Sequence, residues 1–137
     1  MFYDLYFCIE RSEKAEELYK KAIELDPNMA INFGNYSVLL IILRKFEEAK
    51  GNIIKSFEIN HKNILREDLE LELWFYCYAI FYNEYPEAEE KMKTLLDKGV
   101  NSPYWDLSGV LDAAKEKSHT DYDKLKKYAE LISGENK

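Results

Sequence analysis

Cysteine, glycine and proline are all scarce in this sequence. Of its 137 residues, two are cysteine, five are glycine and three are proline. Cys8 and Cys77 cannot make a disulfide framework, and no C-x-x-C pair offers metal-ligand spacing. The glycines form neither a G-x-G-x-x-G motif nor a phosphate loop. The chain is long enough to bury about two thirds of its unfolded surface without metals or disulfides, so we expect two buried thiols and no cofactor.

Positive charge and long apolar runs are also lacking. The chain has 19 Lys and Arg against 26 Asp and Glu, which gives a net charge of −7. This balance repels a phosphate backbone, so nucleic acid is not an expected partner. The longest apolar run, Leu73 to Tyr82, is shorter than the about 20 residues that span a bilayer. The N-terminal "MFYDLYF" has no charge pattern of a signal peptide. We expect a cytoplasmic protein with no membrane partner.

Residues typical of catalysis or metal binding are few. His61 and His119 are the only histidines, and neither lies in an H-E-x-x-H motif. The main alternative to a non-catalytic protein is an enzyme or metal site near His119, where "HTDYD" could offer nitrogen and oxygen ligands. We prefer an acidic first helical turn favoured by the helix dipole. Glutamates in stretches such as "EDLELE" are expected to lie on solvated helix faces. The sequence therefore predicts no catalytic residue, no metal and no enzyme.

Helical periodicity is abundant. Apolar residues at Ala15, Leu18, Tyr19, Ala22 and Ile23 follow the spacing of an amphipathic helix, which the following Asp-Pro-Asn ends. The stretch "LELWFYCYAIFY" is apolar on nearly every face, as in a helix packed on most sides. No segment alternates with period two. We expect an all-α protein of eight helices, in pairs at about 1–27, 28–62, 63–98 and 99–134.

Cap residues predict where several of these helices begin and end. The first helix is expected within residues 1–10, ahead of a second one from Ala15. Ser102 precedes Pro103, as a serine cap precedes a proline in a first turn, so the seventh helix is expected to begin near Pro103. Thr120 is expected to cap the eighth helix, and Gly134 to stop it.

The helix pairs repeat. "AEELYKKAIELDPN" at residues 15–28 recurs in outline 34 residues later as "AKGNIIKSFEINHK", at 49–62. The chain therefore resembles the tetratricopeptide repeat (TPR) family, whose unit has 34 residues. The matching positions are Ala15, Tyr19, Ala22 and Pro27 in the first unit and Ala49, Ile53, Ser56 and His61 in the second. The resemblance implies one domain over 1–137, a right-handed α-α superhelix (TPR-like solenoid) of about four helix pairs.

The resemblance also implies a binding surface. In the family, the first helix of each pair lines a concave groove that holds a peptide or a partner's helix. Asn35 matches one position of the clamp with which some members grip chaperone tails, but Glu70 and Trp74 stand where that clamp needs basic residues. Chaperone tails are thus not expected. The partner-binding residues that the resemblance implies are Asn35, Val38, Ile41, Ile42, Glu70, Trp74, Cys77 and Phe81.

This surface is mostly apolar, which gives the functional hypothesis. We expect a non-catalytic protein–protein interaction module, or scaffold, that binds an apolar peptide or helix of another protein. One alternative is that these side chains are simply buried, by the C-terminal helices or by a second copy of the chain. In the latter case the protein is a self-associating structural protein, a homodimer, because a large apolar patch is unusual on a free monomer.

Overall fold

The computed structural model describes residues 2–103 and 105–134, with side chains from Glu13 onward. These residues form seven α-helices and no strand, which confirms the all-α class. By their internal contacts the residues divide into two compact units, Met1–Asn63 (unit 1) and Ile64–Lys137 (unit 2). The division lies one residue after the end of the second predicted helix pair.

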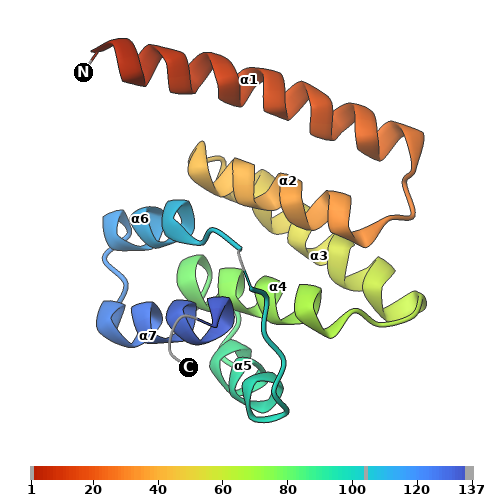
Figure 1. Cartoon of the computed structure of the whole chain (residues 1–137), viewed down its shortest axis with the longest axis vertical. Coiled ribbons are helices and arrows are strands. Elements are labelled where there is room, and N and C mark those ends of the chain that lie inside the picture. The colour runs from red at the N-terminus through yellow and green to blue at the C-terminus, as the bar shows by residue number, and fades with distance from the viewer. Residues whose placement is uncertain (1, 104, 135–137) are drawn as a thin grey trace. The chain divides into compact units, whose positions relative to one another are not determined.

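Unit 1 consists of α1 (Phe2–Leu25), α2 (Ala30–Ile42) and α3 (Phe46–Lys62), with α2 in contact with both other helices (Figure 1). The sequence of α2, "AINFGNYSVLLII", has no charged residue, which suits a helix covered on two sides. Leu40 and Ile41 of α2 and Ala49 and Ile53 of α3 are fully buried. The Ser56 hydroxyl of α3 donates to the Ala30 carbonyl oxygen over 2.8 Å and so fixes the register of this helix pair.

The turn predicted inside the first helix pair is absent, because a single helix occupies this region. The repeat pattern predicts a helix within residues 1–10 and another from Ala15, but α1 is continuous from Phe2 to Leu25. The intervening "ERSEK" contains neither glycine nor proline, so nothing in it interrupts helical hydrogen bonding. The expected stop at the Asp-Pro-Asn turn is confirmed, because α1 ends one residue before it. The described residues thus form seven helices where eight were predicted for the chain.

Unit 2 is built around α4 (Glu67–Ile80), which contacts α5 (Ala88–Asp97), α6 (Ser108–Glu116) and α7 (Tyr122–Ser133) (Figure 1). Ten of its fourteen residues are buried, as its apolar sequence predicts. Facing it are Val110, Ala113 and Ala114 of α6 and Leu125 and Ile132 of α7, all fully buried. Three helices therefore share one central helix as their core partner.

The start of α6 differs from the prediction. It begins at Ser108 rather than near Pro103. The Ser102 side chain does not cap a helix, because its hydroxyl donates to the Glu72 carboxyl of α4. Its backbone N–H donates to the Ile132 carbonyl oxygen of α7 over 2.7 Å. Residues 101–103 and 105–107 therefore belong to a connector tied to α4 and α7. The helix starts only where Asp106 accepts from the Ser108 N–H, at 3.0 Å.

The ends of α7 are close to those predicted. Asp121 caps it instead of the neighbouring Thr120, and the Asp121 carboxylate accepts from the Lys124 N–H over 3.2 Å. Gly134 ends it with φ of +79°, in the left-handed conformation that glycine adopts without strain. The predicted stop at Gly134 is thus confirmed, and the predicted cap is off by one residue.

Two glycines give a matched test of backbone strain. Gly99, just after α5, has φ of +88°, and no atom lies within 4 Å of a β-carbon built there. Gly99→Ala is therefore expected to lower the free energy of unfolding by about 1 kcal/mol through strain alone. Gly51 lies inside α3, also with open space around it. Gly51→Ala should therefore raise the free energy of unfolding by about 0.5–1 kcal/mol. Urea unfolding followed by far-UV circular dichroism measures the free energy of unfolding of both variants. Equal changes in the two would contradict the difference in backbone conformation between Gly99 and Gly51.

None of the described helices is both long enough and apolar enough to cross a membrane.

Candidate functional site

The predicted binding residues of α2 differ in exposure. Ile41 is fully buried, so its side chain belongs to the core of unit 1. Asn35 and Val38 are half-buried, and Ile42 is 42% exposed at the end of the helix. Asn35, Val38 and Ile42 follow one another at spacings of three and four residues, which places them along one face of α2. We call this face, Asn35-Val38-Ile42, the α2 surface.

Asn35 has an unusual environment within this surface. Its amide oxygen is buried and accepts no hydrogen bond from any described residue. A buried polar atom without a partner costs about 1–3 kcal/mol, and most such atoms in proteins are paired. A side-chain amide both donates and accepts, as does the backbone of a peptide. The α2 surface thus combines apolar side chains with an unsatisfied polar group.

The predicted residues of α4 are mostly in the core of unit 2. Glu70, Cys77 and Phe81 are buried, and burial raises the pKa of the Cys77 thiol. Trp74 is half-buried, with its ring 6.5 Å from the Tyr85 ring in an edge-on arrangement. Buried side chains cannot contact a partner without rearrangement, so for Glu70, Cys77 and Phe81 the alternative of simple burial fits better. The binding role of the eight residues together stays a prediction.

Cys77 is buried, as expected, whereas the side chain of Cys8 lies outside the described residues.

Glu72 is a buried carboxyl group in unit 2, and its burial was not predicted. The "EDLELE" pattern favours solvated glutamates, but Glu70 and Glu72 are both buried. Burial raises the pKa of the Glu72 carboxyl to about 7, although the Ser102 hydrogen bond opposes this and nearby Asp68 adds to it. In "LELEL" a leucine stands on either side of each glutamate. Leucines so spaced point to several faces of the helix, which indicates that α4 is buried on all sides.

Glu72 and Ser102 form one of two attachments between the connector and α4. The second lies one helical turn further along α4, where the Trp105 indole N–H donates to the Tyr76 hydroxyl oxygen over 2.7 Å. Tyr76 is itself almost fully buried. A buried hydrogen bond at the first point and a part-buried one at the second hold the connector in place. Glu72 therefore has a structural partner, and it does not line the cavity between α6 and α7.

His119 also has a structural role, because its ring makes its contacts within unit 2. Its ring lies edge-on between the rings of Tyr78 and Tyr82, at centroid distances of 5.0 and 4.8 Å. Its Nδ1 accepts from the Asp121 N–H over 3.0 Å, which leaves Nε2 to donate to the Tyr78 carbonyl oxygen over 3.1 Å. Both ring nitrogens are therefore used within unit 2. Among the described residues, no three His, Cys, Asp or Glu side chains are grouped to hold a metal ion.

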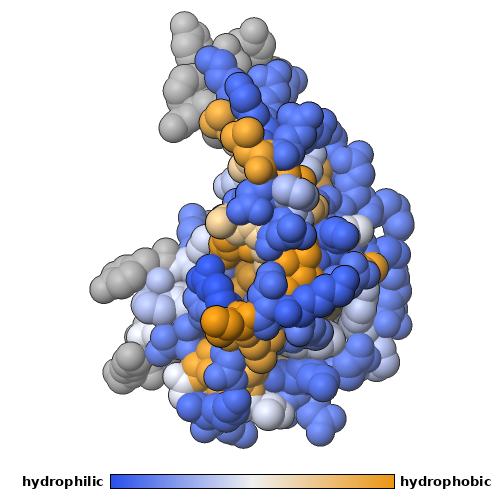
Figure 2. Space-filling model, turned by 90° about the vertical axis from the view of Figure 1, so that its right-hand side faces the viewer, coloured by the Kyte–Doolittle hydropathy of each residue, from blue (hydrophilic) through white to orange (hydrophobic). Residues whose placement is uncertain are grey.

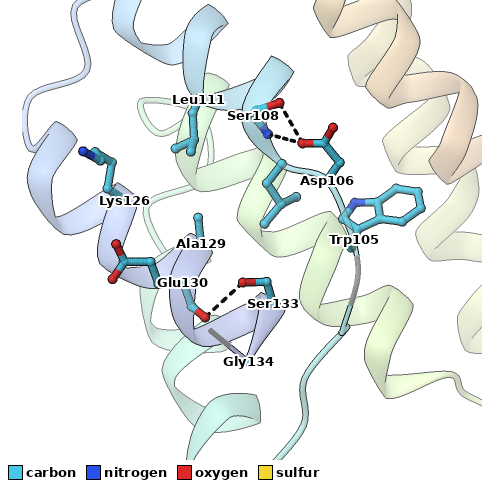
Figure 3. A pocket seen from close by; sticks show the side chains of 10 residues that line it. Trp105, Asp106, Ser108, Leu111, Lys126, Ala129, Glu130, Ser133 and Gly134 are labelled. Carbon is cyan, nitrogen blue, oxygen red and sulfur yellow. Dashed lines mark hydrogen bonds between the residues drawn. The ribbon is translucent and has the colours of Figure 1, made fainter. Parts of the chain in front are cut away.

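One cavity of about 580 Å³ lies in unit 2 between α6, α7 and the connector (Figure 3). Leu111 of α6 points toward Ala129 of α7 across it. The Ser108 hydroxyl and N–H donate to Asp106 at the rim, and these bonds lower the pKa of the Asp106 carboxyl. Lys126 and Glu130 of α7 add one charge of each sign. The lining is mixed in polarity. In the contact of the Ser108 hydroxyl with the Asp106 carboxylate, the base is weakened by the lowered pKa of Asp106, so the cavity indicates no particular reaction.

No protein-family model matches the chain, and it matches neither a curated protein nor a solved structure.

Proposed function

We propose that the chain is a non-catalytic protein–protein interaction module that binds an apolar peptide or helix of another protein. The proposal takes the chain to be a TPR-like solenoid, supported by the 34-residue recurrence between residues 15–28 and 49–62. Consecutive helices α2 and α3, and likewise α4 and α5, contact each other, as the two helices of a repeat unit do. The binding element in unit 1 is the α2 surface.

The unpaired amide oxygen of Asn35 carries this proposal. It lies on the same helix face as Val38 and the partly exposed Ile42. Because this oxygen is buried, the Asn35 side chain must turn outward to meet a partner. The backbone of an extended peptide would then satisfy the amide, and the peptide would cover the two apolar side chains. The gain is a hydrogen bond worth about 0.5–1.5 kcal/mol together with the release of the buried oxygen's desolvation cost. An apolar patch without such a polar group would give affinity but little control of peptide register.

Selection from a displayed library of random peptides on the full chain tests the proposal. We expect the selected peptides to be rich in apolar residues. Ile42→Asp should weaken their binding at least about tenfold by placing a charge in the apolar contact. Asn35→Ala should weaken it about fivefold to tenfold through the lost hydrogen bond. Fluorescence anisotropy of the labelled peptides measures both effects.

Ile54→Asp is the matched control. Ile54 lies on α3 and is 42% exposed, the same fraction as Ile42. The control therefore adds the same charge at the same exposure without touching the α2 surface, and it should leave peptide binding unchanged. Equal binding by wild type and Ile42→Asp would refute the assignment. So would failure to select any peptide together with a chain mass twice 16.3 kDa in solution.

A further inference from the structure

The helix α1 presents a second apolar surface, separate from the α2 surface. Leu18 and Leu25 are 68% and 81% exposed, although both are large apolar side chains. Together with the half-buried Ala15 and Ala22 they form a row with spacings of three, four and three residues. This is the spacing of the a and d positions of a coiled coil, with alanine at a and leucine at d. We call the row Ala15-Leu18-Ala22-Leu25 the α1 seam.

Contacts within unit 1 fix which side of α1 faces α2. The Tyr19 ring stacks on the Tyr36 ring of α2 at 6.2 Å. The Tyr36 hydroxyl donates to the Glu16 carboxylate over 3.3 Å, and the Lys45 ammonium contacts the same carboxylate at 3.2 Å. Burial raises the pKa of the Glu16 carboxyl, but hydrogen bonds from Lys45 and Lys20 outweigh this and lower it. Glu16 thus stays ionised and holds α1 by charge.

This anchoring leaves the two leucines of the α1 seam uncovered, while its two alanines are half-buried. Tyr19 follows Leu18 directly, and successive residues of a helix point about 100° apart. With Tyr19 turned toward α2, Leu18 and Leu25 must point well away from it, in agreement with their exposure. Figure 2 shows hydrophobic residues reaching the surface among hydrophilic ones on the face that it presents. Single exposed leucines are ordinary, but two at coiled-coil spacing on one helix, with small residues between them, make a surface on which another helix fits.

The charges beside the seam identify the kind of partner. Lys14 and Lys21 flank it one heptad apart, at the g positions that decide partner choice in coiled coils. Both are exposed, and neither ammonium makes an ion pair with another described residue. At the e positions, on the other edge of the seam, lie Tyr19 and the exposed Asp26. Acidic residues of a partner helix are therefore expected opposite the two lysines, where basic ones would be repelled.

A second α1 is a poor occupant of this seam. In an antiparallel pair, g positions face g positions, so lysine would meet lysine. In a parallel pair, Lys14 would face Tyr19, which already stacks on Tyr36, and Lys21 would face Asp26. The Asp26 carboxylate already accepts from the Asn28 N–H, at 3.3 Å. A copy of the chain thus offers the seam at most one opposite charge.

We propose that the α1 seam binds an amphipathic helix of another protein, one with small and large aliphatic residues along its contact stripe and acidic residues beside it. Alanines at a allow the two helices to approach closely, and the two leucines supply the buried apolar area. The contact extends over about 15 Å, the length of residues 15–25 in a helix. This surface is independent of the α2 surface.

Two synthetic helices test the proposal directly. Each has about 21 residues, with leucine and alanine at a and d; one has glutamate at e and g, and the other has lysine there. The full-length chain should bind the glutamate peptide at least about tenfold more tightly than the lysine peptide. Increasing salt should weaken this binding, because exposed charges are screened. Fluorescence anisotropy of the labelled peptides measures both results.

Variants of the chain assign the binding to the seam. Leu18→Asp with Leu25→Asp should abolish it. Lys14→Glu with Lys21→Glu should reverse the preference, so that the lysine peptide binds better. The control is Lys91→Glu with Lys127→Glu, which changes the same number of charges at exposed positions on α5 and α7 and should leave the preference intact. Circular dichroism checks that every variant keeps its helices.

Three outcomes would overturn the proposal. The two peptides could bind equally, neither could bind, or the chain could have twice its monomer mass in solution and revert to a monomer on Leu18→Asp. The last would assign the seam to a second copy. The α2 surface is tested separately, because the Ile42→Asp variant retains the seam and the leucine variants retain the α2 surface.

Discussion

Glu72→Gln is expected to raise the free energy of unfolding by up to about 3 kcal/mol near pH 8 and to leave it almost unchanged near pH 4. The reason is the pKa of the Glu72 carboxyl, which burial raises from 4.5 to about 7. Ionising this group inside unit 2 is costly, whereas in the unfolded chain it is not. Each unit of pKa difference corresponds to about 1.4 kcal/mol. Glutamine keeps the shape and an acceptor for the Ser102 hydroxyl but never ionises.

The direction with pH follows from proton counts. Between pH 4.5 and about 7 the folded state holds the Glu72 proton and the unfolded state has lost it. Stability from the neutral carboxyl is therefore fully present below the unfolded pKa and is lost as pH rises through the folded pKa. Carboxyls such as Glu16, Glu89 and Asp106 have lowered pKa values and act in the opposite direction. The contribution of Glu72 is therefore measured as the difference in the free energy of unfolding between wild type and Glu72→Gln at each pH.

Urea unfolding followed by tryptophan fluorescence measures this difference at several pH values. The chain has two tryptophans, Trp74 and Trp105, and both lie in unit 2, so the signal reports the unit that contains Glu72. Glu90→Gln, at an exposed position of α5, removes the same charge and is the control. If both variants differ from wild type by the same amount at every pH, Glu72 does not have the raised pKa on which the expectation rests.

The sequence predicts helices well where local chemistry decides them. Gly134 ends α7 and the Asp-Pro-Asn turn ends α1 because glycine and proline constrain the backbone by themselves. The repeat pattern suggests a break in α1, yet no residue near Ser12 favours one. Ser102 also has the local features of a helix cap, but its hydroxyl contacts Glu72, 30 residues earlier in the chain. Local rules do not anticipate a partner at that separation.

The candidate surfaces show the same limit. The repeat pattern places Asn35, Val38, Ile41 and Ile42 on one helix, but it does not say which of them the neighbouring helices cover. The structure buries Ile41 and leaves Ile42 partly exposed, although they are adjacent and identical. Leu18 belongs to the predicted buried stripe of its helix and is instead 68% exposed. The contacts of Tyr19 and Glu16 decide this rotation of α1, and they depend on Tyr36 of α2 and on Lys45, just before α3.

Phe81→Ala is expected to lower the free energy of unfolding by about 3–5 kcal/mol, the usual cost of deleting a buried phenylalanine. Phe81 is one of the predicted partner-binding residues, but it is buried at the end of α4, with the Lys117 ammonium 5.6 Å from its ring centre. The loss should appear in urea unfolding followed by tryptophan fluorescence. Leu131→Ala, at a 44% exposed position of α7, is the control and should cost less than about 1 kcal/mol.

The size of the loss distinguishes the two roles that the sequence allows for Phe81. A core residue removes packing and apolar burial when it is truncated, so stability falls whether or not a partner is present. A residue on a binding surface costs little stability in the free chain, and its truncation weakens binding instead. A cost near that of Leu131→Ala, with selected peptides bound more weakly, would return Phe81 to the binding surface. The expected large loss would assign Phe81 to the core of unit 2 and remove it from the predicted binding residues.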